Sequence, residues 1–371
     1  MINGERVKQG RELRGLTQTE LAERIDKDQS TIAYIERGSL QPSDEVLEAI
    51  AIQTGFPPSF FRRESRSGFT SGSLQFRARK MSAGERTRVY QYARTVWESA
   101  EKMAEQINEL PVRIPKLHEP PEIAADVTRS ELGLPPDTPI PHVINAVERA
   151  GVLVLTVPLP LKKWDAFCLW AGEETKRPVI VIASEAPGDR LRYSVAHELG
   201  HLVLHRSLQG ELKVIDQEAN RFAGALLMPE AAMRQELVPP VSLTSLAELK
   251  VRWGVSIQAL AGRARDLGII TERQHKYLFE QLAVRGWRKQ EPSELAVPIE
   301  KPRAVRKMAE LLYGNPIDYK RLAADVGFTT QFAKEIMALH ADRKNMPSVA
   351  KQQTADSGKL LPFVARRKES S

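Results

Sequence analysis

The sequence predicts a multidomain protein in which an all-α N-terminal domain precedes an α+β core and a helical C-terminal extension. Three observations support this fold class. Residues 1–61 contain short amphipathic segments separated by polar turns. Apolar runs rich in β-branched residues lie at 151–157 and 178–183, and a long helical pattern follows them. The chain has 371 residues, of which 42% are hydrophobic, so it can form two or three domains with real cores.

The N-terminal segment carries the signals of two closely spaced helices. Thr17 and Glu20 have the spacing of a capping box, and apolar residues follow at helical intervals. After a short turn, a second helix begins near Gln29. This layout predicts a helix-turn-helix, whose second helix enters the major groove of DNA. We expect Gln29, Ser30 and Thr31 to lie at the base edges, where their side chains can donate and accept hydrogen bonds.

The runs TQTELAERI and QSTIAYIERGSLQPS resemble the XRE/Cro family of helix-turn-helix DNA-binding domains across residues 2–61. The resemblance implies that Gln18 contacts phosphate, that the next helix reads bases, and that a double-stranded DNA operator is the partner. A small helical bundle that binds protein is the alternative. The polar residues clustered where the motif requires them weigh against that alternative.

The strongest chemical signal is the run HELGH at 197–201. His197 and His201 are four residues apart, so on a helix their Cβ atoms lie roughly 5–6 Å apart and both imidazoles can bind one tetrahedral zinc. Glu198 points to an adjacent sector, where it can act as a general base on water. Ordinary histidines on a solvated face are the alternative, but the apolar flanks argue against it. His205 is not expected to be a ligand, because it lies another 6 Å or so along the axis.

A catalytic zinc site needs a third protein ligand. A second helix, predicted over 215–228, carries Asp216 and Glu218 in its first turn. Asp216 shares a face with Asn220, which can hydrogen-bond a zinc-bound histidine one turn on. Glu218 points roughly the other way but has the longer reach. The register therefore favours Asp216 as the third ligand and leaves Glu218 as the alternative.

The runs AHELGHLVLH and EANRFAGALLMP, preceded by RPVIVIAS, resemble the ImmA/IrrE family of zinc metallopeptidases over about residues 120–290. The resemblance implies an α+β zincin-like peptidase core that binds Zn²⁺ through His197 and His201, with Glu198 as the general base. Asp216 falls at the third-ligand position, where the family usually has glutamate. This departure keeps Glu218 open as a ligand.

Together the two resemblances imply a DNA-binding transcriptional regulator whose zinc endopeptidase domain cleaves a repressor protein. The residues by themselves imply only zinc-dependent hydrolysis of an amide in an extended peptide. The strand at 179–183 is predicted to bind this peptide as an added strand. The alternative is a regulator whose zinc domain is a non-catalytic sensor or scaffold. The intact Glu198 weighs against that alternative, and the aspartate at 216 weighs slightly for it.

The net charge of +7 favours an anionic partner. Between residues 62 and 94, nine basic residues stand against two acidic ones, which fits either DNA phosphate contacts or a solvated linker face. A long helix predicted over 82–110 has an apolar seam. This seam predicts either a spacer or a dimer contact, so a homodimer is a further expected partner.

The predicted organisation is a DNA-binding domain at 1–61, a basic linker and long helix at 62–120, a peptidase core at 121–240, a helical extension at 241–340 and a disordered polar tail at 341–371. A helix pair at 318–339 is interpreted as a packing module. The single cysteine, Cys168, lies in an apolar run and predicts a buried structural thiol. No apolar run could span a membrane and no signal segment is evident, so we expect a cytoplasmic protein.

Overall fold

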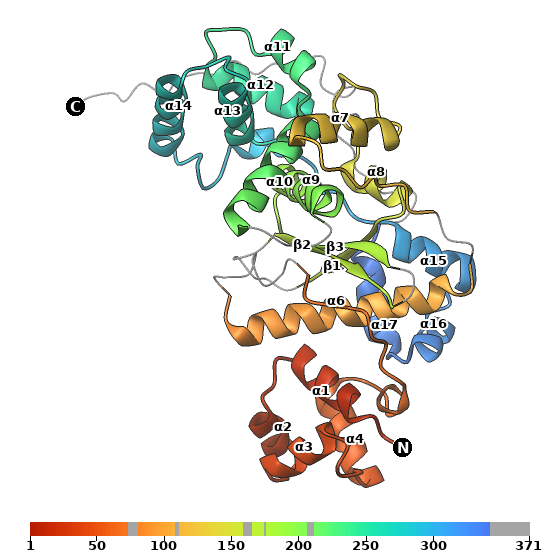
Figure 1. The fold of residues 1–371 in the computed structure, drawn as a ribbon. Helices are drawn as coiled ribbons and strands as arrows, with labels where there is room; N and C mark the ends of the chain where they lie inside the picture. Colours follow the sequence, from red (N-terminus) through yellow and green to blue (C-terminus); the bar gives the residue numbers. More distant parts are fainter. Residues whose placement is uncertain (73–80, 108–110, 159–164, 174–175, 206–210, 342–371) are drawn as a thin grey trace, which may run out of the picture.

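The computed structural model describes residues 1–72, 81–107, 111–158, 165–173, 176–205 and 211–341 (Figure 1). The N-terminal unit is all-α, as predicted. Its elements are α1 (Gly4–Leu13), α2 (Gln18–Arg24), α3 (Gln29–Glu36), α4 (Asp44–Thr54) and the 3-10 turn η1 (Phe60–Arg62). The predicted capping box is present: Thr17 Oγ1 accepts from the backbone N–H of Glu20 at 3.1 Å, and the Glu20 carboxylate accepts from the N–H of Thr17 at 2.7 Å.

A three-stranded sheet lies in the middle of the molecule (Figure 1). Its strands are β1 (Leu153–Val157), β2 (Ala166–Ala171) and β3 (Arg177–Ala183), in the order β1-β3-β2. β3 pairs with β1 in parallel and with β2 in antiparallel orientation. β3 is therefore the central strand, with a neighbour on each edge.

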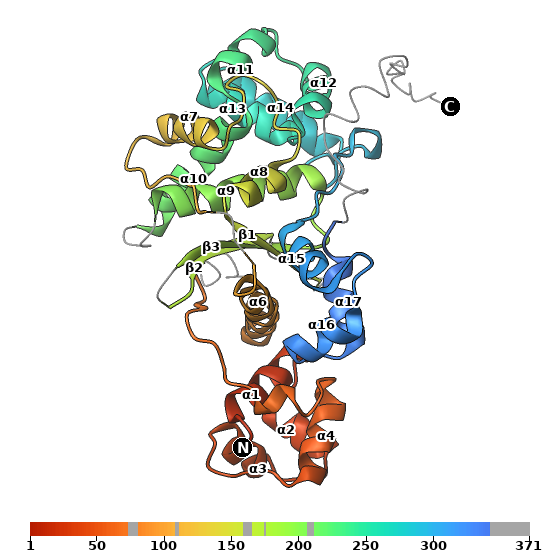
Figure 2. The same cartoon turned by 90° about the vertical axis from the view of Figure 1, so that its right-hand side faces the viewer.

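Both faces of this sheet are buried. Figure 2 shows α6 (Ala83–Ala104) on one side of the sheet and α9 (Gly188–Leu204) on the other. Because successive residues of a strand point to opposite faces, the alternating apolar residues divide between two cores. The core that contains α6 takes Leu153, Leu155, Val157, Phe167, Leu169, Val179 and Val181, and the core that contains α9 takes Val154, Ala166, Cys168, Ile180 and Ile182. Cys168 is buried, as expected.

The apolar seam of α6 is covered within the chain. Ser82 caps this helix at its N-terminus through a capping box with Glu85. The helix contacts α1, β1 and α15 (Ala304–Tyr313). The buried seam residues are Val89, Tyr92, Val96, Trp97, Ala100 and Met103. The seam therefore does not serve as a dimer contact. Residues 108–110 of the predicted helix lie outside the described residues.

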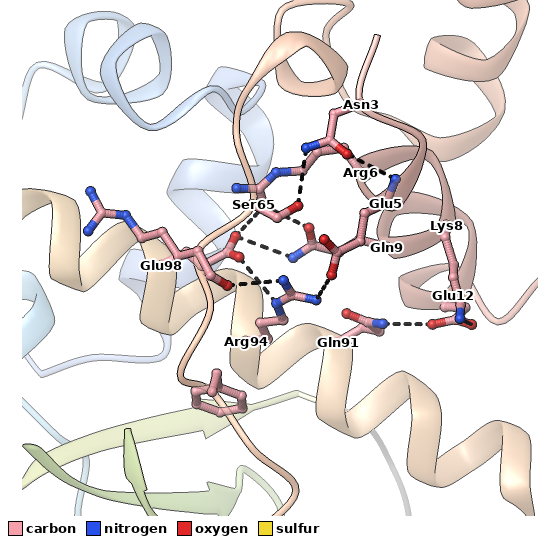
Figure 3. Close-up of polar contacts among 12 residues, drawn as sticks. Asn3, Glu5, Arg6, Lys8, Gln9, Glu12, Ser65, Gln91, Arg94 and Glu98 are labelled. Atoms are coloured by element: carbon pink, nitrogen blue, oxygen red, sulfur yellow. Dashed lines mark hydrogen bonds and ion pairs between the residues drawn. The ribbon is translucent and has the colours of Figure 1, made fainter. Parts of the chain in front are cut away.

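Charged groups, of which Arg6, Arg94 and Glu98 are buried, join α6 to the N-terminal unit (Figure 3). Arg94 donates to the Glu5 carboxylate of α1 at 2.9 Å, and its Nε lies 3.2 Å from Oε1 of Glu98. Arg6 of α1 pairs with the same Glu98. Arg94 is thus a structural contact between the two units, and a role for it on DNA phosphate is wrong. Three other basic residues of the predicted phosphate-binding segment lie outside the described residues: Arg77, Arg79 and Lys80.

The second core is built largely from helices. These are α7 (Pro121–Glu131), α8 (Val143–Arg149), α10 (Leu212–Leu227), α11 (Glu230–Glu236), α12 (Leu243–Trp253), α13 (Ile257–Asp266) and α14 (Glu272–Val284), followed by the 3-10 turn η2 (Ser293–Leu295). Figures 1 and 2 show them on the same side of the sheet as α9, and of this group α8 and α9 contact the strands.

The last helices return to the other side of the molecule. α15, α16 (Tyr319–Val326) and α17 (Thr330–Ala338) share a core with α6 and the N-terminal unit. The ring of Phe332 on α17 lies 5.3 Å, centroid to centroid, from that of Phe56 beyond α4. The range 241–340 thus divides between two cores, and α15 was not predicted. Among the described residues, no helix is long and apolar enough to cross a membrane.

Candidate metal centre

A glycine allows α9 and α10 to pack closely. A Cβ atom at Gly200 would lie only 2.9 Å from Cδ1 of Phe222, closer than real Cβ atoms come to such a neighbour. Phe222 is fully buried against α9. Gly200 therefore lets α10 approach the metal-motif helix, and this packing brings the first turns of α10 beside His197 and His201.

The two histidines of the motif point toward each other. His197 is 2% exposed and His201 is 5% exposed, and their Nε2 atoms lie 3.0 Å apart. A zinc ion about 2.0–2.1 Å from each nitrogen in tetrahedral geometry would separate the nitrogens by about 3.4 Å. The observed spacing is close to that of a chelating pair.

Asn220 fixes the orientation of His197. Its amide nitrogen donates to Oδ2 of Asp216 at 3.3 Å, so its amide oxygen is the atom that lies 2.9 Å from Nδ1 of His197. An amide oxygen can only accept a hydrogen bond, so Nδ1 carries the imidazole proton. The Nε2 lone pair of His197 then faces His201, as a metal ligand requires.

The two acidic candidates on α10 lie in different places. Asp216 Oδ1 is 3.6 Å from Nε2 of His197. One ligand atom each from His197, His201 and Asp216 all lie within 4.8 Å of one another. Glu218 instead places Oε2 2.8 Å from Nε2 of His205. Two imidazoles and one carboxylate form the donor set of a catalytic zinc site, and the residues present fit that metal.

Glu198 lies at a cleft beside this cluster. The side chain is 1% exposed, and it lines a cleft of about 820 Å³ together with His197 and Asn220. The other walls come from the start of β2, the N-terminal end of α9, the start of α13 and the segment 287–299. Asp216, at 48% side-chain exposure, leaves the cluster accessible from solvent.

The sequence analysis did not identify a buried lysine in the wall of the cleft. Lys250 of α12 pairs with Asp189 of α9 and lies 2.9 Å from Oε2 of Glu291. The segment that carries Glu291 passes directly over the start of α9, where a Cβ at Gly188 would lie 2.2 Å from the carbonyl oxygen of Val297. The signal in the sequence was a lysine among the apolar residues of α12.

The prediction that the strand at 179–183 binds the peptide substrate as an added strand is wrong. Residues 179–183 belong to β3, whose two edges already pair with β1 and β2. β2 has an outer edge, and its first residue, Ala166, lines the cleft together with the preceding Asp165. Just beyond the other end of β2, the backbone carbonyl of Gly68 accepts from the N–H of Gly172 at 3.1 Å. The beginning of β2 is therefore the part of the sheet that meets the cleft.

The predicted DNA-contact residues gather at the start of α3. Gln29 and Ser30 are exposed and Thr31 is half-buried. Gln29 Nε2 donates to Oε1 of Gln18 at 2.6 Å, and Gln18 Nε2 donates to Oε2 of Glu36 at 2.7 Å. The glutamine that opens α2 and the one that opens α3 are thus held in one line on the same surface.

The search of curated proteins found no match. A crystal structure of Bacillus thuringiensis PlcR in complex with the peptide PapR7 and DNA is similar at 15% sequence identity, covering 78% of this chain and 98% of that chain. The TM-score is 0.15, so this likeness supports no argument about fold or function.

Two families match parts of the sequence. Residues 7–61 match the helix-turn-helix family, which covers α1 to η1. Residues 147–265 match the family described as the IrrE N-terminal-like domain, a peptidase-type family, and this range contains the sheet, α9 and α10. The chain therefore combines an XRE-type helix-turn-helix domain with an IrrE/ImmA-like domain of the metallopeptidase type.

Proposed function

We propose that this protein is a DNA-binding transcriptional regulator whose second domain is a zinc endopeptidase that cleaves a repressor protein. One observation carries the proposal: the ligand atoms of His197, His201 and Asp216 converge within 4.8 Å of one another, beside a cleft that Glu198 lines. A purely structural zinc site needs no general base at a cleft. The helix-turn-helix domain supplies the DNA-binding half of the proposal.

The proposed mechanism assigns each residue a part. His197, His201 and Asp216 would hold the metal. When bound, zinc would polarise the scissile carbonyl and make water more acidic. Glu198 takes a proton from the attacking water, whose oxygen adds to the carbonyl carbon. The C–N bond then breaks, and Glu198 returns the proton to the leaving nitrogen, so its carboxylate is restored.

Purified protein and any repressors encoded by neighbouring genes provide the test. Zinc-loaded protein is expected to cut one of these repressors, and the same protein treated with a chelator is expected to leave it intact. DNA binding by the chelated protein serves as the control, because the N-terminal domain is distant from the metal centre (Figure 1). If the zinc-loaded protein hydrolyses neither the repressors nor a library of unstructured peptides, the endopeptidase proposal fails.

The third ligand is tested through metal affinity. Asp216→Ala is expected to weaken zinc binding by more than about 100-fold, because it removes a donor atom rather than a group that orients one. His197→Ala and His201→Ala should act likewise, and Glu218→Ala should cost less. Competition with a chromogenic chelator measures each dissociation constant. A larger loss for Glu218→Ala than for Asp216→Ala would assign the ligand to Glu218.

The DNA contacts are tested through sequence preference. Replacing Gln29 or Thr31 with Ala is expected to relax the preference at one base pair by about 1–3 kcal/mol, because these side chains lie where the motif reads base edges. We propose that two copies of the protein bind a pseudo-palindromic operator. Footprinting on the promoters of the protein and its neighbours measures both. If neither variant changed the base preference, α3 would not be the helix that reads the DNA bases.

A further inference from the structure

Two side chains beside the metal centre have no part in the mechanism above. His205 lies at the C-terminal end of α9, and Glu218 lies on α10. The side chain of His205 is 9% exposed, with its Nδ1 atom 3.2 Å from Nδ1 of His201 and its Nε2 atom 2.8 Å from Oε2 of Glu218. These contacts form a line from Glu218 through His205 to His201.

The chemistry of the groups fixes the protons along this line. A carboxylate oxygen only accepts, so Nε2 of His205 donates to Glu218. A neutral imidazole has one N–H, so Nδ1 of His205 accepts, and the proton it accepts is on Nδ1 of His201. Nε2 of His201 then holds a lone pair, and this atom lies 3.0 Å from Nε2 of His197.

We propose that His205 and Glu218 are positioning residues that hold His201 in the tautomer able to bind the metal. This inference rests on the proposed zinc site. Each of the two histidine ligands would then donate its Nδ1 proton to a hydrogen-bond partner, because Nδ1 of His197 already donates to the amide oxygen of Asn220. Histidines that bind metals commonly donate their other N–H to such a partner, which orients the ring and raises its basicity.

The placement of the two acids on α10 separates their roles. Asp216 faces His197 at the metal side of the ring, with 3.6 Å between Oδ1 and Nε2. Glu218, one position beyond the intervening Gln217, reaches His205 and through it the opposite nitrogen of His201. An ion pair on an open surface would link only Glu218 and His205. The half-buried contact of His205 with His201 extends the pair to the proposed metal ligand.

Nuclear magnetic resonance can read the tautomers directly. The chain has seven histidines, so selective ¹⁵N labelling of histidine gives a simple two-bond ¹H–¹⁵N spectrum. Metal-free protein at a pH of about 8 keeps ordinary imidazoles neutral. The unaltered protein is expected to show His201 with its proton on Nδ1 and His205 with its proton on Nε2. Glu218→Leu is expected to shift both rings to tautomer mixtures.

Matched variants distinguish loss of the Glu218–His205 hydrogen bond from the effect of adding a leucine side chain to α10. Glu218→Gln keeps an acceptor oxygen and is expected to retain both tautomers, whereas Gln217→Leu places the same leucine on the exposed neighbouring position and should change nothing. Zinc affinity should fall about 10–100-fold in Glu218→Leu and in His205→Phe, and little in Glu218→Gln. Glu218 is 43% exposed, so Glu218→Leu should fold even if His205→Phe does not.

The two possible failures are distinguishable. Unchanged tautomers in Glu218→Leu, or equal zinc loss in Glu218→Leu and Gln217→Leu, would overturn the positioning role. Absence of zinc binding by the unaltered protein would instead overturn the proposed function. The tautomer spectrum of the metal-free protein would then still decide whether the line of hydrogen bonds exists.

Discussion

Glu198→Gln is expected to reduce repressor cleavage by about 10²–10⁴-fold, the contribution that a general base makes to proton transfer. Glutamine keeps the size and much of the hydrogen bonding of this buried residue, but its amide cannot accept the proton of water. The rate of cleavage by purified, zinc-loaded protein measures the loss. In cells, repression of the target genes should persist under the inducing condition.

The same variant decides between the two functions. It should bind zinc and DNA as the unaltered protein does, because Glu198 is not among the three clustered ligand residues. Glu185→Gln, at an exposed position just before α9, is the matched control and should cleave normally. A Glu198→Gln protein that still relieves repression in cells would show that hydrolysis is not how the domain works. The sensor or scaffold function would then stand.

Glu300→Ala should destabilise the fold by about 3–5 kcal/mol, the cost of leaving a buried partner charge unpaired. The Glu300 side chain is 1% exposed and pairs with Arg192 of α9, whose side chain is equally buried. Its two carboxylate oxygens also accept the backbone N–H groups of Val143 and Ile144, at 3.1 and 2.8 Å, which caps α8. Urea unfolding measures the change.

An exposed acid nearby is the control for this prediction. Glu294→Ala, in η2, should change the free energy of unfolding by less than about 0.5 kcal/mol. Glu300→Gln should recover part of the loss, because an amide oxygen can still accept from the start of α8. Similar unfolding midpoints for Glu300→Ala and Glu294→Ala would mean that the Arg192 ion pair contributes little to folding.

The site residues that the sequence predicted are those related by one turn of a helix. His197 and His201 share a face of α9, and Asp216 and Asn220 share a face of α10, so spacing alone implied each pair. The capping box of α2 is equally local. The preference for Asp216 over Glu218 rested on the same spacing, because Asn220 lies one turn beyond Asp216 and can orient a zinc-bound histidine.

The missed features depend on contacts distant in sequence. β3 is the central strand because it pairs with both β1 and β2. The sequence did not predict this, because an apolar run has the same pattern in a central strand and in an outer one. Lys250 has its partners 61 and 41 residues away, at Asp189 and Glu291. His205 reaches Glu218 only because of how α10 packs against α9, which spacing along one helix does not report.

The sheet between α6 and α9 has a consequence for how this protein can be divided. A chain that began at residue 121, the predicted start of the peptidase core, would keep all three strands but lack α6. Leu155, Phe167 and Val181, which lie in the α6 core, would then face water. The helix α6, which follows the helix-turn-helix domain, thus also covers one face of the sheet in the IrrE-like domain. A peptidase-like domain expressed without residues 83–104 would therefore need another apolar surface to cover this face of the sheet.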